Sequence, residues 1–179
     1  PNGAGKTTTF NMLTGVYTPT EGKILFDGKS IGGLDPYKVT RQGISRTFQN
    51  IRLFKELSVL DNVKVANHGL AKHNLISSIF RLPSHFKGEA KMEEESLAFL
   101  KIFGLDVYRD ELSKNLPYGM QRRLEIARAL AANPKLLLLD EPAAGMNPQE
   151  THDLMELIAF IRKEFDLTIL LIEHDMHLV

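Results

Sequence analysis

The residue types best suited to chemistry occur in two short stretches near opposite ends of the chain. The first is Pro1 to Thr8, which reads Pro-Asn-Gly-Ala-Gly-Lys-Thr-Thr, and the second is Asp140 and Glu141 after four leucines. Glycines allow successive backbone amides to surround a phosphate at a helix start, and a lysine adds a mobile positive charge. Two carboxylates at a strand tip can serve a metal ion and a water molecule. Together the stretches indicate phosphoryl-transfer chemistry on a nucleotide.

Each residue of the two stretches has an expected role. Thr7 is expected to place its hydroxyl on Mg²⁺ and Thr8 to meet the α-phosphate. Asp140 is expected to hold the Mg²⁺ shell, and Glu141 to orient or deprotonate the attacking water. The alternative for the first stretch is a Gly-rich turn before an ordinary helix. The alternative for the two carboxylates is a capping pair with no catalytic role. The predicted phosphate-binding residues are Asn2, Gly3, Ala4, Gly5, Lys6, Thr7 and Thr8.

Apolar periodicity and turn residues predict the elements that position these groups. The residue pair Asn147-Pro148 is suited to a helix start, with Asn147 as N-cap and Pro148 in the first turn of a helix to about Phe165. Strand, helix and strand in succession imply a parallel sheet. The expected elements are a helix over 7–14, a hairpin strand over 21–28, and strands over 44–48, 135–140 and 167–172.

The middle of the chain has a helical pattern. Ser58 is a candidate cap of one helix, residues 89–103 carry apolar residues at near-helical spacing, and another helix follows Gly119 to about Ala132. The stretch around residues 68–87 is poorly periodic. We therefore expect a helical insert in a catalytic core, with residues 1–49 and 131–179 forming the core and residues 50–130 the helical subdomain.

Composition restricts the class of protein. The 179 residues are 43% hydrophobic and 25% charged, which is typical of a folded globular protein. Because 22 basic residues balance 22 acidic ones, the net charge produces no long-range electrostatic field that would attract nucleic acid. No apolar run approaches the roughly 20 residues of a membrane-spanning helix. The absence of cysteine fits the cytoplasm. The phosphate-binding motif lacks its first glycine, so we expect that the first strand is missing. We also expect that the C-terminal elements of the sheet are missing, and we interpret the chain as a fragment.

A third stretch indicates which class of nucleotide-binding protein this is. Leu116-Pro117-Tyr118-Gly119-Met120-Gln121 and the helix behind it resemble the signature of ATP-binding cassette ATPases, Leu-Ser-Gly-Gly-Gln. In that family the start of this helix reaches the γ-phosphate bound by an opposed second subunit. Pro117 replaces the serine and has neither its hydroxyl nor an amide proton, so the contact would depend on Gly119 and the helix end. A plain helix start is the alternative.

The resemblance implies further site residues and a fold. Gln49 matches the glutamine that senses Mg²⁺ or the water, and His174 matches the switch histidine at the γ-phosphate. Leu116, Gly119 and Gln121 would contact the partner's nucleotide. The family implies an α/β fold, a P-loop NTPase (RecA-like) parallel-sheet core with an antiparallel β part and an inserted α-helical subdomain. ATP and Mg²⁺ are the implied cofactors.

Three stretches are similar to one subgroup, the larger ATP-binding subunits of branched-chain amino acid importers: residues 45–54, 118–127 and 141–148. That similarity implies uptake powered by ATP, a second ATPase subunit, two integral-membrane permease subunits and an external substrate-binding protein, without nucleic acid. The chain would lie peripherally at the cytoplasmic face of the inner or plasma membrane. A soluble cassette ATPase acting on ribosomes or DNA remains an alternative, whereas a small-molecule kinase does not explain residues 116–130.

Overall fold

The computed structural model describes residues 4–68 and 83–173. Contacts divide the chain into two compact units, one formed by Pro1–Asn50 with Pro134–Val179 and the other by Ile51–Asn133. The first unit contains a parallel sheet and the second contains helices. The subdivision of the sequence at residues 49 and 130 stays a prediction.

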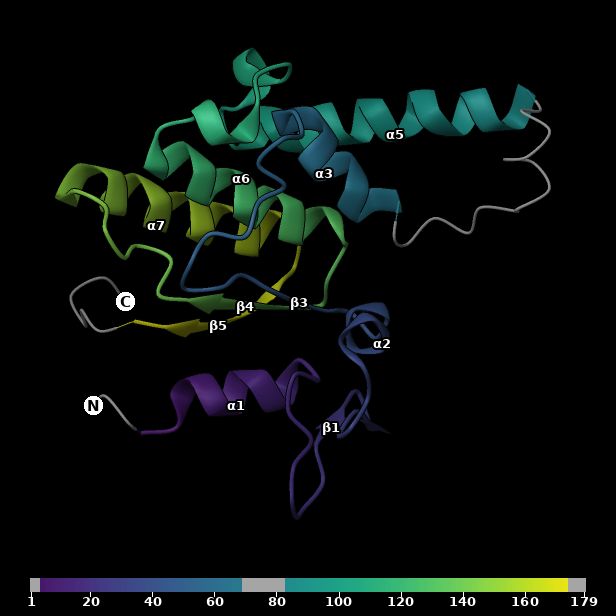
Figure 1. Ribbon diagram of the computed structural model, residues 1–179, viewed down its shortest axis with the longest axis vertical. Coiled ribbons are helices and arrows are strands. Elements are labelled where there is room, and N and C mark those ends of the chain that lie inside the picture. The colour runs from purple at the N-terminus through teal and green to yellow at the C-terminus, as the bar shows by residue number, and fades with distance from the viewer. Residues whose placement is uncertain (1–3, 69–82, 174–179) are drawn as a thin grey trace. The chain divides into compact units, whose positions relative to one another are not determined.

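The sheet of the first unit has three parallel strands in the order β3-β4-β5. Helix α1 lies on one side of this sheet and helix α7 on the other (Figure 1). This arrangement confirms the α/β class and the parallel sheet that were expected. The strands are β3 (Ile44–Arg46), β4 (Leu136–Asp140) and β5 (Thr168–Ile172), and the helices are α1 (Lys6–Leu13) and α7 (Pro148–Glu164).

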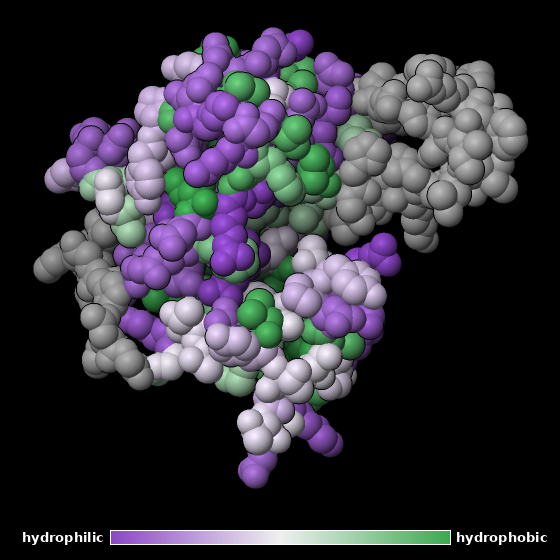
Figure 2. All heavy atoms as spheres, in the orientation of Figure 1, coloured by the Kyte–Doolittle hydropathy of each residue, from purple (hydrophilic) through white to green (hydrophobic). Residues whose placement is uncertain are grey.

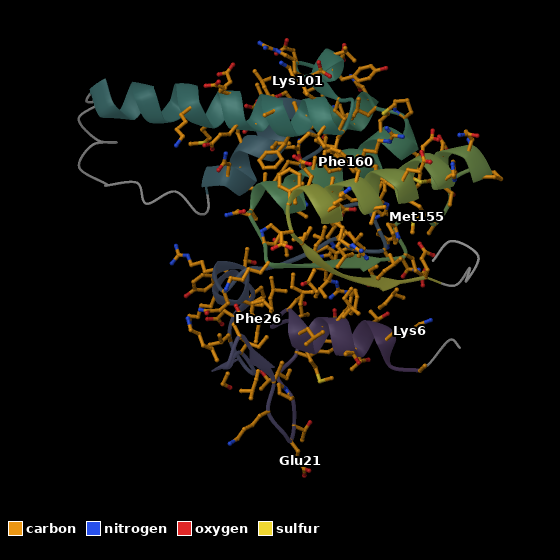
Figure 3. The ribbon with its side chains drawn as sticks, turned by 180° about the vertical axis from the view of Figure 1, so that it is seen from behind. Lys6, Glu21, Phe26, Lys101, Met155 and Phe160 are labelled. Atoms are coloured by element: carbon orange, nitrogen blue, oxygen red, sulfur yellow. The ribbon has the colours of Figure 1, made fainter. Side chains whose placement is uncertain are left out.

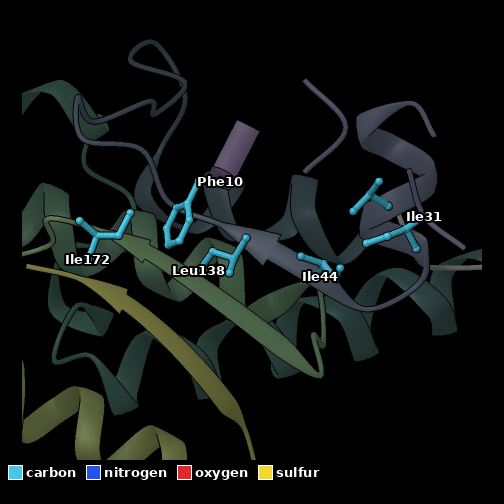
Figure 4. Close-up of a cluster of buried hydrophobic side chains, with 6 residues drawn as sticks. Phe10, Ile31, Ile44, Leu138 and Ile172 are labelled. Atoms are coloured by element: carbon cyan, nitrogen blue, oxygen red, sulfur yellow. The ribbon is translucent and has the colours of Figure 1, made fainter. Parts of the chain in front are cut away.

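Strand β4 is the buried centre of the sheet. Leu137, Leu138 and Leu139 are fully buried, as expected for a strand covered on both faces. Phe10 of α1 packs over Leu138 and Ile172 in the core beneath that helix (Figure 4). Because alternate residues of a strand share a face, the side chain of Asp140 leaves β4 on the same face as Leu138. The packing of α1 therefore decides which groups surround this carboxylate.

Helix α7 begins where the sequence predicts. The Asn147 side chain accepts a hydrogen bond from the Glu150 amide at 2.9 Å, and the Glu150 carboxylate accepts one from the Asn147 amide at 3.0 Å. This reciprocal pair satisfies amides that the first helical turn leaves without partners. The loop between Glu141 and the helix is thereby fixed at its far end.

The antiparallel part is smaller than predicted. Strands β1 (Leu25–Phe26) and β2 (Lys29–Ser30) pair across a two-residue turn, so the expected strand over 21–28 was wrong in extent. Asp27 and Gly28 have φ values of 48° and 74°, the left-handed conformations that a tight hairpin turn requires. The turn residues had been counted as strand because the alternation of side chains continues up to them. Helix α2 (Pro36–Arg41) follows.

The second unit is helical. Helix α3 packs against both α5 and α6, and Ser58 accepts a hydrogen bond from the Asp61 amide at 3.0 Å, which confirms the predicted cap. Helix α5 begins before residue 89, where the sequence had placed its start, and α6 begins one residue before Gly119. The elements are α3 (Val59–His68), α5 (Pro83–Ile102), the 3₁₀ turns η1 (Asp106–Tyr108) and η2 (Ser113–Asn115), and α6 (Tyr118–Ala131).

The exterior of the described residues is mixed in polarity. On the face drawn in Figure 2, apolar residues form small patches among hydrophilic and neutral ones. Within residues 4–68 and 83–173, no helix combines the length and the apolar character needed to cross a membrane.

Candidate active site

The predicted phosphate-binding loop leads into α1. Gly5 is the N-cap of this helix with φ at 76°, and no side chain caps the helix start. A Cβ atom at Gly5 would meet no other atom within 4 Å, so the glycine is needed for its backbone conformation and not for space. Uncapped amides at a helix N-terminus are a favourable site for phosphate. The loop geometry therefore suits an anion at this end of α1.

The side chains of the first turn also suit a nucleotide. Lys6 projects from the start of α1 (Figure 3), and Thr7 and Thr8 are exposed beside it. Ala4 precedes them and is exposed as well. The phosphate-binding role of these consecutive residues stays a prediction, and two members of the predicted site, Asn2 and Gly3, lie outside the described residues.

The two carboxylates after the apolar run differ in environment. Asp140 ends β4 and is 3% exposed, while Glu141 is partly buried. Glu141 has φ at 47°, a left-handed conformation that is uncommon for a residue other than glycine, asparagine or aspartate. Its amide donates to the Ile172 carbonyl at 2.9 Å, which ties the end of β4 to the end of β5. The backbone is thus held in a strained conformation immediately after β4.

Gln49 meets Glu141 directly. The Gln49 Nε2 atom donates to Glu141 Oε2 at 2.9 Å, across 92 residues of sequence. Both residues belong to the first unit, so this contact is internal to it. The structure therefore brings together the glutamine that only the family resemblance indicated and the carboxylate that the residue pattern indicated.

The donor set is compatible with Mg²⁺. Mg²⁺ prefers oxygen ligands, keeps several waters, and commonly uses only one or two protein carboxylates. Thr7, Gln49 and Asp140 offer a hydroxyl, an amide oxygen and a carboxylate. Across the part of the chain that the structure describes, no cluster of three histidine, cysteine or acidic side chains is arranged to hold a metal. A magnesium ion carried largely by nucleotide phosphates fits this set better than an all-protein metal site.

The signature-like stretch lies in the second unit at the start of α6. Pro117 is the N-cap, and Gly119 is partly buried in the first turn. Leu116 is buried, at 5% exposure, and its carbonyl accepts from Gln121 Nε2 at 2.8 Å. The Gln121 amide therefore stabilises the loop that it follows. His174 lies outside the described residues.

Sequence reasoning missed a buried charge network in α6. The Arg122 Nη1 atom donates to Glu125 Oε2 at 2.8 Å, and the two side chains are 0% and 1% exposed. Glu125 also accepts from the Arg52 amide at 3.1 Å. Burial lowers the pKa of Arg128, an effect that the neighbouring Glu125 carboxylate opposes. The i, i+3 spacing of arginine and glutamate was visible in the sequence, but such pairs usually lie on exposed helix faces.

A second missed residue is Glu173, at the end of β5. Its Oε1 atom accepts from the Ala143 amide at 3.2 Å, two residues beyond Glu141. The sequence feature that could have indicated Glu173 is its position directly before His174. Its contact helps to fix the loop that follows β4.

The family is decided by comparison with protein-family models. The model described as ABC transporter matches residues 1–144 of this chain. The chain belongs to the ABC transporter family.

Curated relatives of this ABC protein match along its whole length. It is 49% identical over 179 residues to the high-affinity branched-chain amino acid transport ATP-binding protein BraF of Pseudomonas aeruginosa, and covers 70% of that protein. It is 48% identical over 179 residues to LivG of Escherichia coli, and again covers 70% of the relative. The resemblance to cassette ATPases, and the similarity of three stretches to the ATP-binding subunits of branched-chain amino acid importers, are confirmed.

Solved cassettes have the same fold. The ATP-binding cassette MJ1267 of an ABC transporter matches 98% of this chain and 68% of its own length, with a TM-score of 0.81 and 32% identity. A dimeric post-hydrolysis state of the cassette MJ0796, bound to ADP and Pi, matches 99% of this chain and 73% of its own, with a TM-score of 0.80 and 26% identity. The chain is accordingly an ABC-type ATPase that binds ATP and ADP.

Replacement of Lys6 by alanine is expected to weaken ATP binding by roughly 10- to 150-fold, because a charge-assisted hydrogen bond contributes about 1.5–3 kcal/mol. The measurement is nucleotide affinity by calorimetry. Lys23→Ala, which removes an exposed lysine from the same unit, is the matched control and is expected to bind ATP like the parent. Unchanged affinity in Lys6→Ala would remove this lysine from the phosphate site.

Proposed function

We propose that this chain is the ATP-hydrolysing subunit of an importer for branched-chain amino acids. The observation that carries the proposal is 49% identity over the whole chain to BraF, whose name states that transport activity. The geometry around α1 and β4 supports the ATPase part. The identity of the transported substrate rests on the relatives alone, because an ATPase core does not touch the cargo.

The proposed mechanism begins with nucleotide binding at the first turn of α1. Amides of the phosphate-binding loop and Lys6 would hold the phosphates, and Thr7 and Asp140 would supply oxygen ligands to the metal shell. Bound Mg²⁺ would supply charge neutralisation for the β- and γ-phosphate oxygens. The remaining task of the protein is to place the attacking water and to accept or direct its proton.

Glu141 and Gln49 carry out that task in the proposal. The carboxylate of Glu141 is the general base or the water-orienting group, and the Gln49 amide holds it from the side through their 2.9 Å hydrogen bond. A base that is fixed in orientation loses less entropy on reaching the transition state. His174 is the proposed contact to the γ-phosphate. Phosphoryl transfer depends chiefly on such positioning and on charge stabilisation.

Two ATPase subunits, identical or different, are proposed to share each nucleotide. The α6 start of an opposed subunit, with Leu116, Gly119 and Gln121, would face the γ-phosphate held by Lys6 of the first. Because Pro117 has no amide proton, that contact depends on the glycine and the helix end. Closure of the dimer by ATP and its reopening after product release would provide the motion that a transporter needs.

The proposed partners are a second ATPase subunit, two integral-membrane permease subunits and an external substrate-binding protein. The proposed location is peripheral, on the cytoplasmic face of the membrane. A cassette ATPase acting on ribosomes or DNA is the alternative, since fold alone does not assign the partner. The balance of 22 basic and 22 acidic residues favours the importer over a nucleic-acid partner.

The proposal is tested by purifying the protein with its membrane partners in detergent, in the presence of ATP and Mg²⁺, and identifying the partners by mass spectrometry. We expect two permeases and a second ATPase. Reconstituted vesicles should then take up labelled leucine, isoleucine or valine only when the matching binding protein and ATP are present. Glutamate and arginine are the control substrates. Recovery of ribosomal or DNA-bound partners, or uptake of the controls alone, would overturn the proposed transport function.

A further inference from the structure

A buried arginine on β3 joins the two structural elements that carry two of the proposed metal ligands, Thr7 on α1 and Asp140 on β4. Arg46 Nη2 donates to Asp140 Oδ2 at 2.8 Å, and both side chains are 5% exposed. Arg46 Nη1 donates to Asn11 Oδ1 at 2.6 Å, and Asn11 belongs to α1. The guanidinium thus connects the carboxylate at the tip of β4 to the helix that begins at the phosphate loop.

Two aromatic rings hold this guanidinium in place. The carbon at its centre lies 5.3 Å from the centroid of the Phe10 ring and 4.9 Å from that of Phe48. Rings on an arginine limit its rotation and add cation–π attraction, which grows when the cation is removed from water. Arg46 is therefore confined both by its hydrogen bonds and by packing, and it cannot turn away from Asp140 without losing several contacts together.

The arrangement is poorly explained as a stability device. Removing two charges from water costs free energy, and buried ion pairs can often be replaced by apolar residues without loss of stability. A buried pair can instead fix one orientation of a side chain. Here it leaves Asp140 with a second carboxylate oxygen, Oδ1, that the arginine bond does not use. Orientation is what a metal-binding carboxylate requires.

The positions along α1 make the same connection. Asn11 lies four residues after Thr7, one helical turn further on and on the same side of the helix. Arg46 therefore links Asp140 to the turn of α1 that follows the hydroxyl proposed for the magnesium shell. A change in this link would alter the spacing between Thr7 and Asp140 while leaving both residues present.

We propose that Arg46 is a positioning residue that orients the Asp140 carboxylate and sets its spacing to Thr7 for magnesium. The inference deepens the proposed function and rests on it, because Asp140 must belong to the metal shell. Removal of a residue that orients a metal ligand typically costs roughly 10- to 100-fold in metal affinity. The loss should fall on the metal and not on the nucleotide itself.

The test uses the intact protein with a non-hydrolysable ATP analogue and Mn²⁺ as the spectroscopic probe. Mn²⁺ affinity of the protein–nucleotide complex is measured by electron paramagnetic resonance, and affinity for the analogue is measured separately in EDTA. Arg46→Gln is expected to lower Mn²⁺ affinity by roughly 10- to 100-fold with analogue binding in EDTA unchanged. Arg46→Lys keeps the charge without the planar fork and should give a smaller loss.

Two further variants keep the test decisive. Asn11→Ala loosens the arginine without removing its charge, so it carries the test if Arg46→Gln does not fold, and it too should weaken Mn²⁺ binding. Arg41→Gln, which changes an exposed arginine at the end of α2, is the matched control and should bind Mn²⁺ like the parent.

Asp140→Asn separates the two ways in which the inference can fail. If Asp140→Asn weakens Mn²⁺ binding and neither Arg46→Gln nor Asn11→Ala does, the positioning role is excluded and the proposed metal site stands. If Asp140→Asn leaves Mn²⁺ binding unchanged, the metal site and the inference both fall. Equal losses of analogue binding with and without metal would assign Arg46 a purely structural role.

Discussion

Replacing Glu141 by glutamine is expected to lower the rate of ATP hydrolysis by roughly 10²- to 10⁴-fold and to leave ATP affinity close to that of the parent. The amide has nearly the shape of the carboxylate, so it can keep a hydrogen bond to Gln49 in the position that the 2.9 Å contact defines. It cannot accept a proton from water at neutral pH. The substitution therefore separates nucleotide binding from chemistry.

The measurement is phosphate release at saturating ATP, with ATP affinity determined in parallel. Glu21→Gln is a suitable control, because Glu21 is an exposed carboxylate of the same unit at the tip of the turn before β1 (Figure 3). Its hydrolysis rate is expected to equal the parental rate. Turnover by Glu141→Gln near that rate would show that the carboxylate is not the base or the water-orienting group.

Replacing Glu125 by alanine is expected to destabilise the protein by about 3–5 kcal/mol. Glu125 is 1% exposed and neutralises the fully buried Arg122, to which it is joined at 2.8 Å. Arg128 is also near this carboxylate, which opposes the lowering of its pKa by burial. Loss of the carboxylate would leave two neighbouring positive charges in a region of low polarity and would remove the acceptor of the Arg52 amide.

The matched control is Glu56→Ala. Glu56 pairs with Lys114 at 2.6 Å in the same unit, but the two side chains are 77% and 42% exposed. Such a pair contributes about 0–1 kcal/mol, because water and salt screen it. Urea unfolding followed by circular dichroism compares the variants, and Glu125→Gln should fall between them. Equal shifts for Glu125→Ala and Glu56→Ala would contradict the importance of burial.

Regular elements with strong local signals were predictable from the sequence. Four consecutive leucines before two acids indicated a buried strand with a polar tip, and β4 is that strand. Asn147 followed by Pro148 indicated a helix start, and α7 begins there with a capping box. In both cases the residues that determine the structure are neighbours in sequence. Local preference and tertiary packing then favour the same conformation.

Several contacts could not be predicted locally because they join residues that are distant in sequence. Arg46 is the last residue of the short strand β3, and an arginine at a strand end is usually exposed to solvent; its partner Asp140 is 94 residues away. Gln49 and Glu141 are likewise 92 residues apart, and only the family resemblance had related them. No local pattern encodes such a pair, because the sheet order β3-β4 creates it.

The left-handed backbone of Glu141 has a consequence for how such a protein changes under selection. A residue with a Cβ atom in this conformation costs about 1–2 kcal/mol, part of which glycine would recover. If a library of variants is selected only for heat resistance, we therefore expect glutamate to be lost at this position. If the library is selected for growth on the imported nutrient, we expect glutamate to be kept. At Glu141, with its φ value of 47°, selection for thermal stability and selection for activity therefore favour different amino acids.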